Sequence, residues 1–260
     1  MSGVLSPALS GTVRYEATLA LRRRAAWLSL IPLCLLALLL GLGSQGLTSY
    51  TDPMARMGAT AMMVNALGSI GVAIALADRL AAQRRPGLRE LLGTTPAGPA
   101  GRAAGVLLGP WLVALVPVAL VLLALGVIVS ASAGSARPLL GALIGLVTIV
   151  LPGSLLLTTI ATLLGLILPV AAARILVIPL WYWATALSPL IPVPTITGTL
   201  LSPLGSYQSA VWLGTLPPPD EGGWLRPAAS PAVAVLAIGV TLAMALLFFL
   251  LSRPILAVRR

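Results

Sequence analysis

Lysine and histidine are both absent from this chain of 260 residues, and cysteine occurs once, as Cys34. Without Lys there is no phosphate-binding loop of the GxxxxGK[ST] type, so we expect the chain not to bind and hydrolyse ATP itself. Without His there is no Ser-His-Asp triad and no histidine metal site, and a lone Cys forms neither an internal disulfide nor a metal site. The sequence therefore predicts no catalytic residue, no metal site and no cofactor bound by this chain.

Charged residues are also scarce, at 8% of the chain, whereas a soluble domain carries about 25%. Hydrophobic residues make up 58%. A water-soluble fold of this size does not hide so much apolar surface, so the composition predicts an all-α integral membrane protein. The net charge of +10 does not indicate nucleic-acid binding, because the Arg residues flank apolar runs rather than cover a folded face.

Six apolar runs are candidates for transmembrane helices, each of which needs about 20 residues. They cover residues 26–43, 57–77, 104–130, 139–163, 171–189 and 232–252. This topology places 13 of the 16 Arg residues on one side, namely Arg14, Arg22, Arg23, Arg24, Arg79, Arg84, Arg85, Arg89, Arg102, Arg174, Arg253, Arg259 and Arg260. Arg56, Arg137 and Arg226 lie on the other side. The positive-inside rule then places both termini in the cytoplasm, and the Arg-only, Ala- and Leu-rich usage suggests a bacterial plasma membrane.

Two segments outside these spans are expected to lie at the membrane surfaces. Residues 9–24 have the periodicity of a basic amphipathic helix, which can lie along the inner surface. A disordered basic leader is the alternative. Residues 188–230 form the outer connection between the fifth and sixth spans, and their Pro and Gly content disfavours a continuous helix. We expect short re-entrant helices that dip into the outer leaflet.

The longest cytoplasmic connection is the 26-residue loop 78–103. Pro86 fits the first turn of a helix and Gly93 fits its C-terminal cap. Between them, Leu88, Leu91 and Leu92 form a small apolar ridge on a charged loop. Such a helix suits docking into a groove of a soluble partner. The alternative is a solvated loop whose arginines only enforce topology.

The same loop resembles the cytoplasmic loop of type-2 ABC exporter permeases through an R-x-x-G-x-x-x-L-L-x-x-x-P core that begins at Arg84. The order of elements along the chain is similar to that family as well. Where family members often carry a Glu-Arg pair ahead of the glycine, this chain has Gln83, Arg84 and Arg85.

The resemblance implies a coupling helix between spans 2 and 3 that contacts a separate ABC ATPase subunit, which would bind ATP and Mg. It also implies a second permease chain, identical or homologous. The residues expected at the ATPase contact are Arg84, Arg85, Gly87, Leu88, Arg89, Glu90, Leu91, Leu92 and Pro96.

The polar residues within the spans are few and uncharged. Asn65, Ser69, Thr158, Thr159 and Thr162 are candidates for lining a transport pathway, with hydrogen bonding between helices as the alternative. The absence of acidic residues deep within the spans argues against a proton- or ion-coupled carrier. We therefore expect residues 1–260 to form a single permease domain of an ATP-driven exporter, in contact with membrane lipids. A secondary transporter or channel is the alternative, and a membrane-embedded enzyme is a more distant one.

Overall fold

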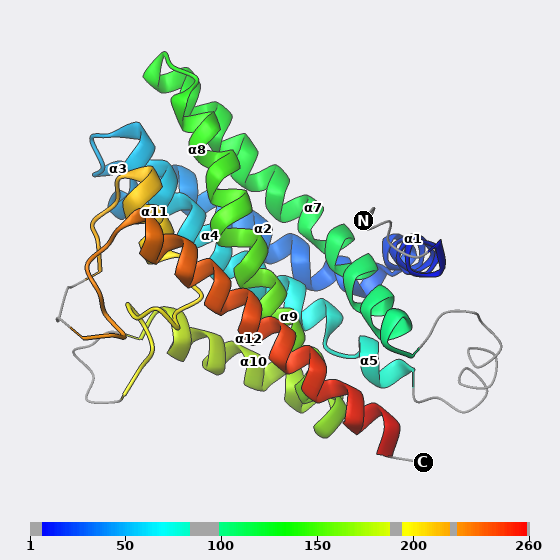
Figure 1. Ribbon diagram of the computed structural model, residues 1–260. Helices are drawn as coiled ribbons and strands as arrows, with labels where there is room; N and C mark the ends of the chain where they lie inside the picture. Colours follow the sequence, from blue (N-terminus) through cyan, green and yellow to red (C-terminus); the bar gives the residue numbers. More distant parts are fainter. Residues whose placement is uncertain (1–6, 84–98, 188–193, 219–222, 259–260) are drawn as a thin grey trace.

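The structure is a computed structural model that describes residues 7–83, 99–187, 194–218 and 223–258. Over these residues it is all-helical and contains no β-strand, which confirms the all-α part of the predicted fold class. Several of the helices are long and apolar, as in a multi-pass membrane protein. Figure 1 shows most of the long helices running along one elongated bundle, whereas the first helix of the chain, in dark blue, is seen end-on at one end of it.

Four helical stretches are long and apolar enough to cross a membrane: Pro53–Ala82, Ala100–Ala133, Arg137–Ile167 and Pro231–Leu256. The first contains α4 (Pro53–Leu76) and α5 (Arg79–Ala82), and the second is α7 (Pro99–Ala133). The third consists of α8 (Arg137–Gly145), the π-helical turn η1 (Leu146–Val150) and α9 (Leu151–Ile167), and the fourth is α12 (Pro231–Val258). They coincide with the second, third, fourth and sixth predicted spans.

The other two predicted spans take different forms. α1 (Pro7–Arg22) and α2 (Arg24–Gly43) meet at a bend of 79°, and the bent pair counts as a fifth candidate span. α10 (Val170–Thr185) is apolar but has only 16 residues. It is separated from α9 by Leu168, which is held in an extended conformation ahead of Pro169. The six-span topology therefore stays a prediction.

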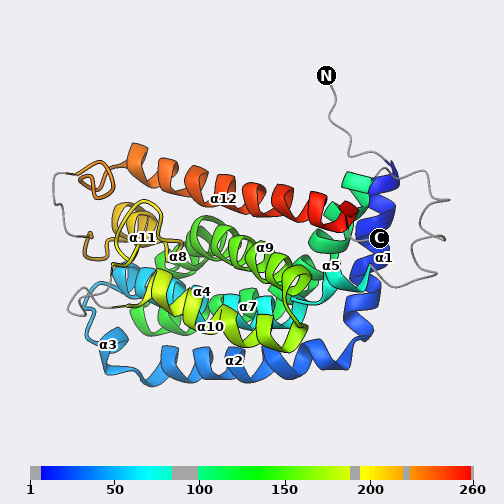
Figure 2. The ribbon, with the colours of Figure 1, turned by 90° about the horizontal axis from the view of Figure 1, so that it is seen from below.

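The two ends of the described chain lie at the same end of the bundle, together with α1 and α5 (Figures 1 and 2). The short helices α3 (Gln45–Thr48) and α11 (Ser206–Leu213) lie at the opposite end. This is the arrangement that an even number of crossings produces.

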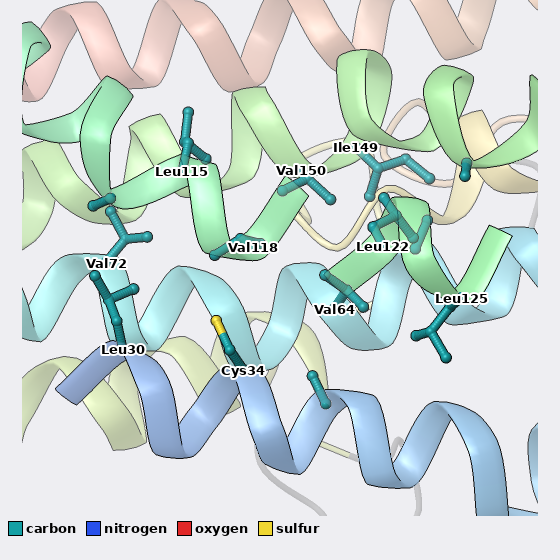
Figure 3. Close-up of a cluster of buried hydrophobic side chains, with 14 of the residues drawn as sticks. Leu30, Cys34, Val64, Val72, Leu115, Val118, Leu122, Leu125, Ile149 and Val150 are labelled. Atoms are coloured by element: carbon teal, nitrogen blue, oxygen red, sulfur yellow. The ribbon is translucent and has the colours of Figure 1, made fainter. Parts of the chain in front are cut away.

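α4 lies at the centre of the bundle, where α2, α7, α9 and α10 pack around it. Small residues on α4 let these neighbours approach closely, as in other packed membrane helices. A Cβ atom at Gly68 would lie 2.7 Å from a methyl group of Val118, and one at Gly71 would lie 3.5 Å from the Cα of Leu30. The largest apolar cluster forms here, and Cys34 lies buried within it (Figure 3).

The π-helical turn η1 interrupts the long Arg137–Ile167 helix just before Pro152. A proline ring in a regular helix clashes with the carbonyl four residues earlier, here that of Thr148, and a wider turn relieves the clash. The hydroxyl of Thr148, which lies in this turn, donates to the carbonyl of Ile144, at 2.7 Å.

Candidate functional site

The structure describes both ends of the loop 78–103 but not its middle. Residues 84–98, which include all nine predicted ATPase contacts, lie outside the described residues. The predicted coupling helix therefore stays a prediction. The two attachment points of the loop are α5 on one side and the start of α7 on the other, at the same end of the bundle (Figure 1).

Asp78, the first residue of this loop, joins three separate parts of the chain. Its carboxylate accepts hydrogen bonds from both terminal nitrogens of Arg23, which lies at the bend between α1 and α2. It also pairs with Arg174 of α10, with 3.7 Å between Nη2 and Oδ2. The Nε of Arg174 donates to the carbonyl of Ile74 in α4, at 3.1 Å. Since these side chains are partly exposed, each pair contributes at most about 1 kcal/mol, but together they fix the relative positions of three elements.

A second ion pair joins α1 to α5. Arg79 is only 9% exposed, and its Nη1 lies 3.6 Å from Oε2 of Glu16. Burial raises the pKa of the Glu16 carboxyl, and the guanidinium of Arg79 opposes that rise. The Nε and Nη2 of Arg79 have no hydrogen-bond partner among the described residues. Because a buried guanidinium without its partner is costly, Glu16 is important for keeping Arg79 in place.

α1 also packs directly on the start of α7, at the other end of the loop. A Cβ atom at Gly105 would lie 2.6 Å from Cγ2 of Thr12, and one at Gly109 would lie 2.5 Å from the backbone oxygen of Val13. Together with Gly101, these residues form a GxxxGxxxG pattern that permits close helix packing. The pattern is visible in the sequence, but our sequence analysis missed it. α1 therefore contacts both attachment points of the loop.

The helical periodicity predicted for residues 9–24 is confirmed by α1. Four predicted polar-face residues, Ser10, Arg14, Thr18 and Arg22, are exposed. On the predicted apolar face, Ala20 is buried while Leu21 is 58% exposed. Leu21 is the last residue but one of the helix, where the 79° bend begins to turn the chain away.

Two of the predicted pathway residues instead hold the connection between α10 and α12. Asn65 is fully buried, and its Nδ2 donates to the backbone oxygen of Pro203 at 2.9 Å. Ser69 donates to Oδ1 of Asn65 at 2.8 Å and thereby orients the amide. A Cβ atom at Gly153 would lie 2.5 Å from Oδ1 of Asn65, so α9 needs a glycine at this position.

The other three, Thr158, Thr159 and Thr162, are buried in α9. Their hydroxyls donate to carbonyls of the preceding turn, at 2.7, 2.7 and 2.9 Å. Threonine satisfies its hydroxyl in this way within many helices. All five residues thus lie in the interior of the bundle in this conformation, and their role in a pathway stays a prediction.

The connection between α10 and α12 contains one short helix, α11, within its described residues 194–218. Glycines with positive φ, Gly205 at 91° and Gly214 at 75°, flank α11 at its two ends. A side chain at Gly205 would also meet Ile149 of η1, at 2.5 Å. The described part of this segment is not a continuous helix, in agreement with its Pro and Gly content.

This connection reaches well into the bundle. Asn65 lies 12 residues after Pro53, so its contact with Pro203 lies about 18 Å along α4 from the start of that helix. α11 itself carries buried side chains, including Tyr207 at 1% exposure.

Comparison with known protein families, with curated proteins and with solved structures finds no match to this chain. In the described ranges, no three Cys, Asp or Glu side chains gather as a metal site requires. The case for a function therefore depends on the sequence pattern of the loop and on the contacts around its attachment points.

Proposed function

We propose that this chain is the permease subunit of an ATP-driven ABC exporter. The observation that supports this most is the way in which both attachment points of the loop 78–103 are joined to the same helix, α1. Glu16 of α1 pairs with Arg79 at one end of the loop, and Thr12 and Val13 pack on glycines of α7 at the other. A force applied to the loop would therefore move α1 together with α5 and the start of α7.

In this proposal α2 and α10 complete a six-span permease domain. The 20 residues of α2 measure about 30 Å, which matches the hydrocarbon core of a bilayer. The 16 residues of α10 measure about 24 Å, a shortfall that local thinning of the bilayer accommodates. Tyr182, in the last turn of α10, is 56% exposed and suits anchoring at the membrane interface.

The loop would lie in the cytoplasm of a bacterial plasma membrane, with both termini on the same side. The connection held by Asn65 would be the outer re-entrant segment, which closes the outer end of the bundle. Two such chains would form the pathway between them, and the helix around Leu91 would insert into a groove of each ATPase subunit.

The ATPase subunits, not this chain, would bind ATP and Mg. Their closure would press on the loop and switch the permease between inward- and outward-facing states. The ion pairs of Asp78 would carry the movement from α5 to the α1–α2 bend and to α10, because that carboxylate touches both.

Co-purification from native membranes tests the proposal. The wild-type chain should carry an ABC ATPase subunit with it. Leu91→Asp should insert and express normally but lose the ATPase, because it places an unpaired charge in the docking groove. Arg84→Ala serves as the milder comparison and should lose less, since a charge at the rim of an interface would contribute less than a buried apolar anchor. An ATPase that still co-purifies fully with Leu91→Asp would contradict the proposal, and absence of any ATPase from the wild-type chain would favour a secondary transporter or channel.

A further inference from the structure

A cavity of about 350 Å³ lies between α9, α10 and α12, away from the loop and its ion pairs. α9 forms its floor through residues such as Leu157 and Ile160, and Leu180 and Trp181 of α10 form one wall. Met244 and Phe248 of α12 form the other wall, and Ile196, Leu201 and Pro203 close one end. The cavity is therefore built from three long helices and the connection between α10 and α12.

No polar group of the lining is available to a ligand. The Nε1 of Trp181 donates to the carbonyl of Ala66, and that of Trp183 donates to the carbonyl of Pro194, both at 2.9 Å. The carbonyl of Pro203 accepts from Asn65. The remaining lining side chains are Leu, Ile, Ala, Met and Phe. Water finds no hydrogen-bond partners in such a place, so the cavity suits an apolar occupant such as a hydrocarbon chain.

The cavity opens to the side of the bundle. α12 and α10 each pack along α9, but they make no extensive contact with one another, and Figure 2 shows α9 between them. α12 is also the least buried of the four candidate spans. Met244 lies 13 residues into this 28-residue helix, so the opening is near the middle of the helix, at the depth of lipid chains.

The volume limits the size of the occupant. An apolar cavity of about 150 Å³ holds a molecule the size of benzene, whereas sites for drug-sized ligands run from about 300 to 1,000 Å³. About 350 Å³ is therefore room for one apolar group the size of an acyl chain segment, but not for several chains side by side.

We propose that this cavity binds one acyl chain of a bilayer lipid, which inserts sideways between α10 and α12. The headgroup would stay outside, because the cavity offers it no polar partner. The proposal requires only that the chain lies in a bilayer and does not depend on the exporter assignment.

Photo-crosslinking in vesicles tests the proposal with the purified full-length chain and no ATPase. The probe is phosphatidylcholine with a diazirine midway along one acyl chain, and the crosslinked residues are mapped by mass spectrometry. Lipid around the protein reaches exposed residues such as Leu28, which is 77% exposed. Only a chain inside the cavity reaches Leu157 and Trp181, which are at most 2% exposed. Crosslinks to Leu157 and Trp181 are the expected result.

Met244→Trp fills the cavity from the wall formed by α12, and Leu163→Trp fills it from the floor formed by α9. Each should abolish the crosslinks to Leu157 and Trp181 while labelling of Leu28 is unchanged. Leu247→Trp, on the exposed face of α12, is the matched control and should retain them. The same probe chain on phosphatidylglycerol should crosslink equally, because the headgroup is not recognised. The proposal is overturned if wild-type protein gives no crosslinks at Leu157 and Trp181, if both filled variants keep them, or if they depend on the headgroup.

Discussion

The packing of α1 on α7 can be broken at Gly109 while the matched position Gly101 provides a control on the same helix. A Cβ atom at Gly109 would lie 2.5 Å from the backbone oxygen of Val13 and 3.0 Å from the backbone nitrogen of Ala17. Backbone atoms cannot rotate away as a side chain can, so Gly109→Leu must displace α1 from α7. At Gly101 no described atom lies within 4 Å of a Cβ, and Gly101→Leu should be tolerated.

The expected loss of docking free energy is that of adding a side chain to an already packed contact, which costs about 1–3 kcal/mol. Because backbone rather than side chain must move, we expect the upper part of that range. The pair between Glu16 and Arg79 is present with and without the substitution, so it does not enter this difference. A change of about 3 kcal/mol increases the undocked population of α1 by about two orders of magnitude.

Thiol labelling measures this population. Ala20 is 4% exposed on the packed face of α1, so Ala20→Cys in a Cys34→Ala background reports undocking through its rate of reaction with a maleimide. We expect fast labelling with Gly109→Leu and slow labelling with Gly101→Leu. Equal labelling rates in these two variants would refute the packing of α1 on α7.

Two further predictions concern the ion pairs and the topology. Asp78→Asn removes the carboxylate that Arg23 and Arg174 share. This change should cost about 1 kcal/mol and lower the midpoint of thermal unfolding by about 2–4 °C at low salt. The difference from wild type should shrink at high salt, and a difference that is independent of salt would exclude an ionic origin. For the topology, a cysteine at Ala257 should be protected from an impermeant thiol reagent in intact cells while one at Glu221 should react, and labelling of Ala257 from outside would contradict the six-span arrangement.

Local patterns in the sequence predicted much of the fold. The periodicity of residues 9–24 identified α1 and its exposed polar face, and the apolar runs identified the four long candidate spans. The gap between the apolar runs 139–163 and 171–189 contains the break between α9 and α10. These features depend on neighbouring residues, so a single sequence is sufficient to find them.

Contacts between distant residues could not be predicted in this way. Asn65 and Pro203 are 138 residues apart, and only the folded chain shows that the amide of Asn65 binds a backbone carbonyl of the connection between α10 and α12. A polar residue in a span has the same sequence signal whether it lines a pathway or holds a neighbouring segment. The pairing of Asp78 with Arg23 and Arg174 is likewise a product of packing, since all three were assigned to the same membrane side but not to one cluster.

The most direct test of the exporter proposal is a crosslink from the loop 78–103 to an ATPase subunit. Leu91→Cys in the Cys34→Ala background, treated with a short thiol-to-amine crosslinker in native membranes, should join this chain to an ABC ATPase identified by mass spectrometry. The yield should change when ATP and Mg are added, because closure of the ATPase moves the docking groove. The same crosslinker at Ser135→Cys, at the opposite end of the bundle between α7 and α8, should capture no ATPase. Capture of no ATPase by Leu91→Cys, or equal capture from both positions, would contradict the account.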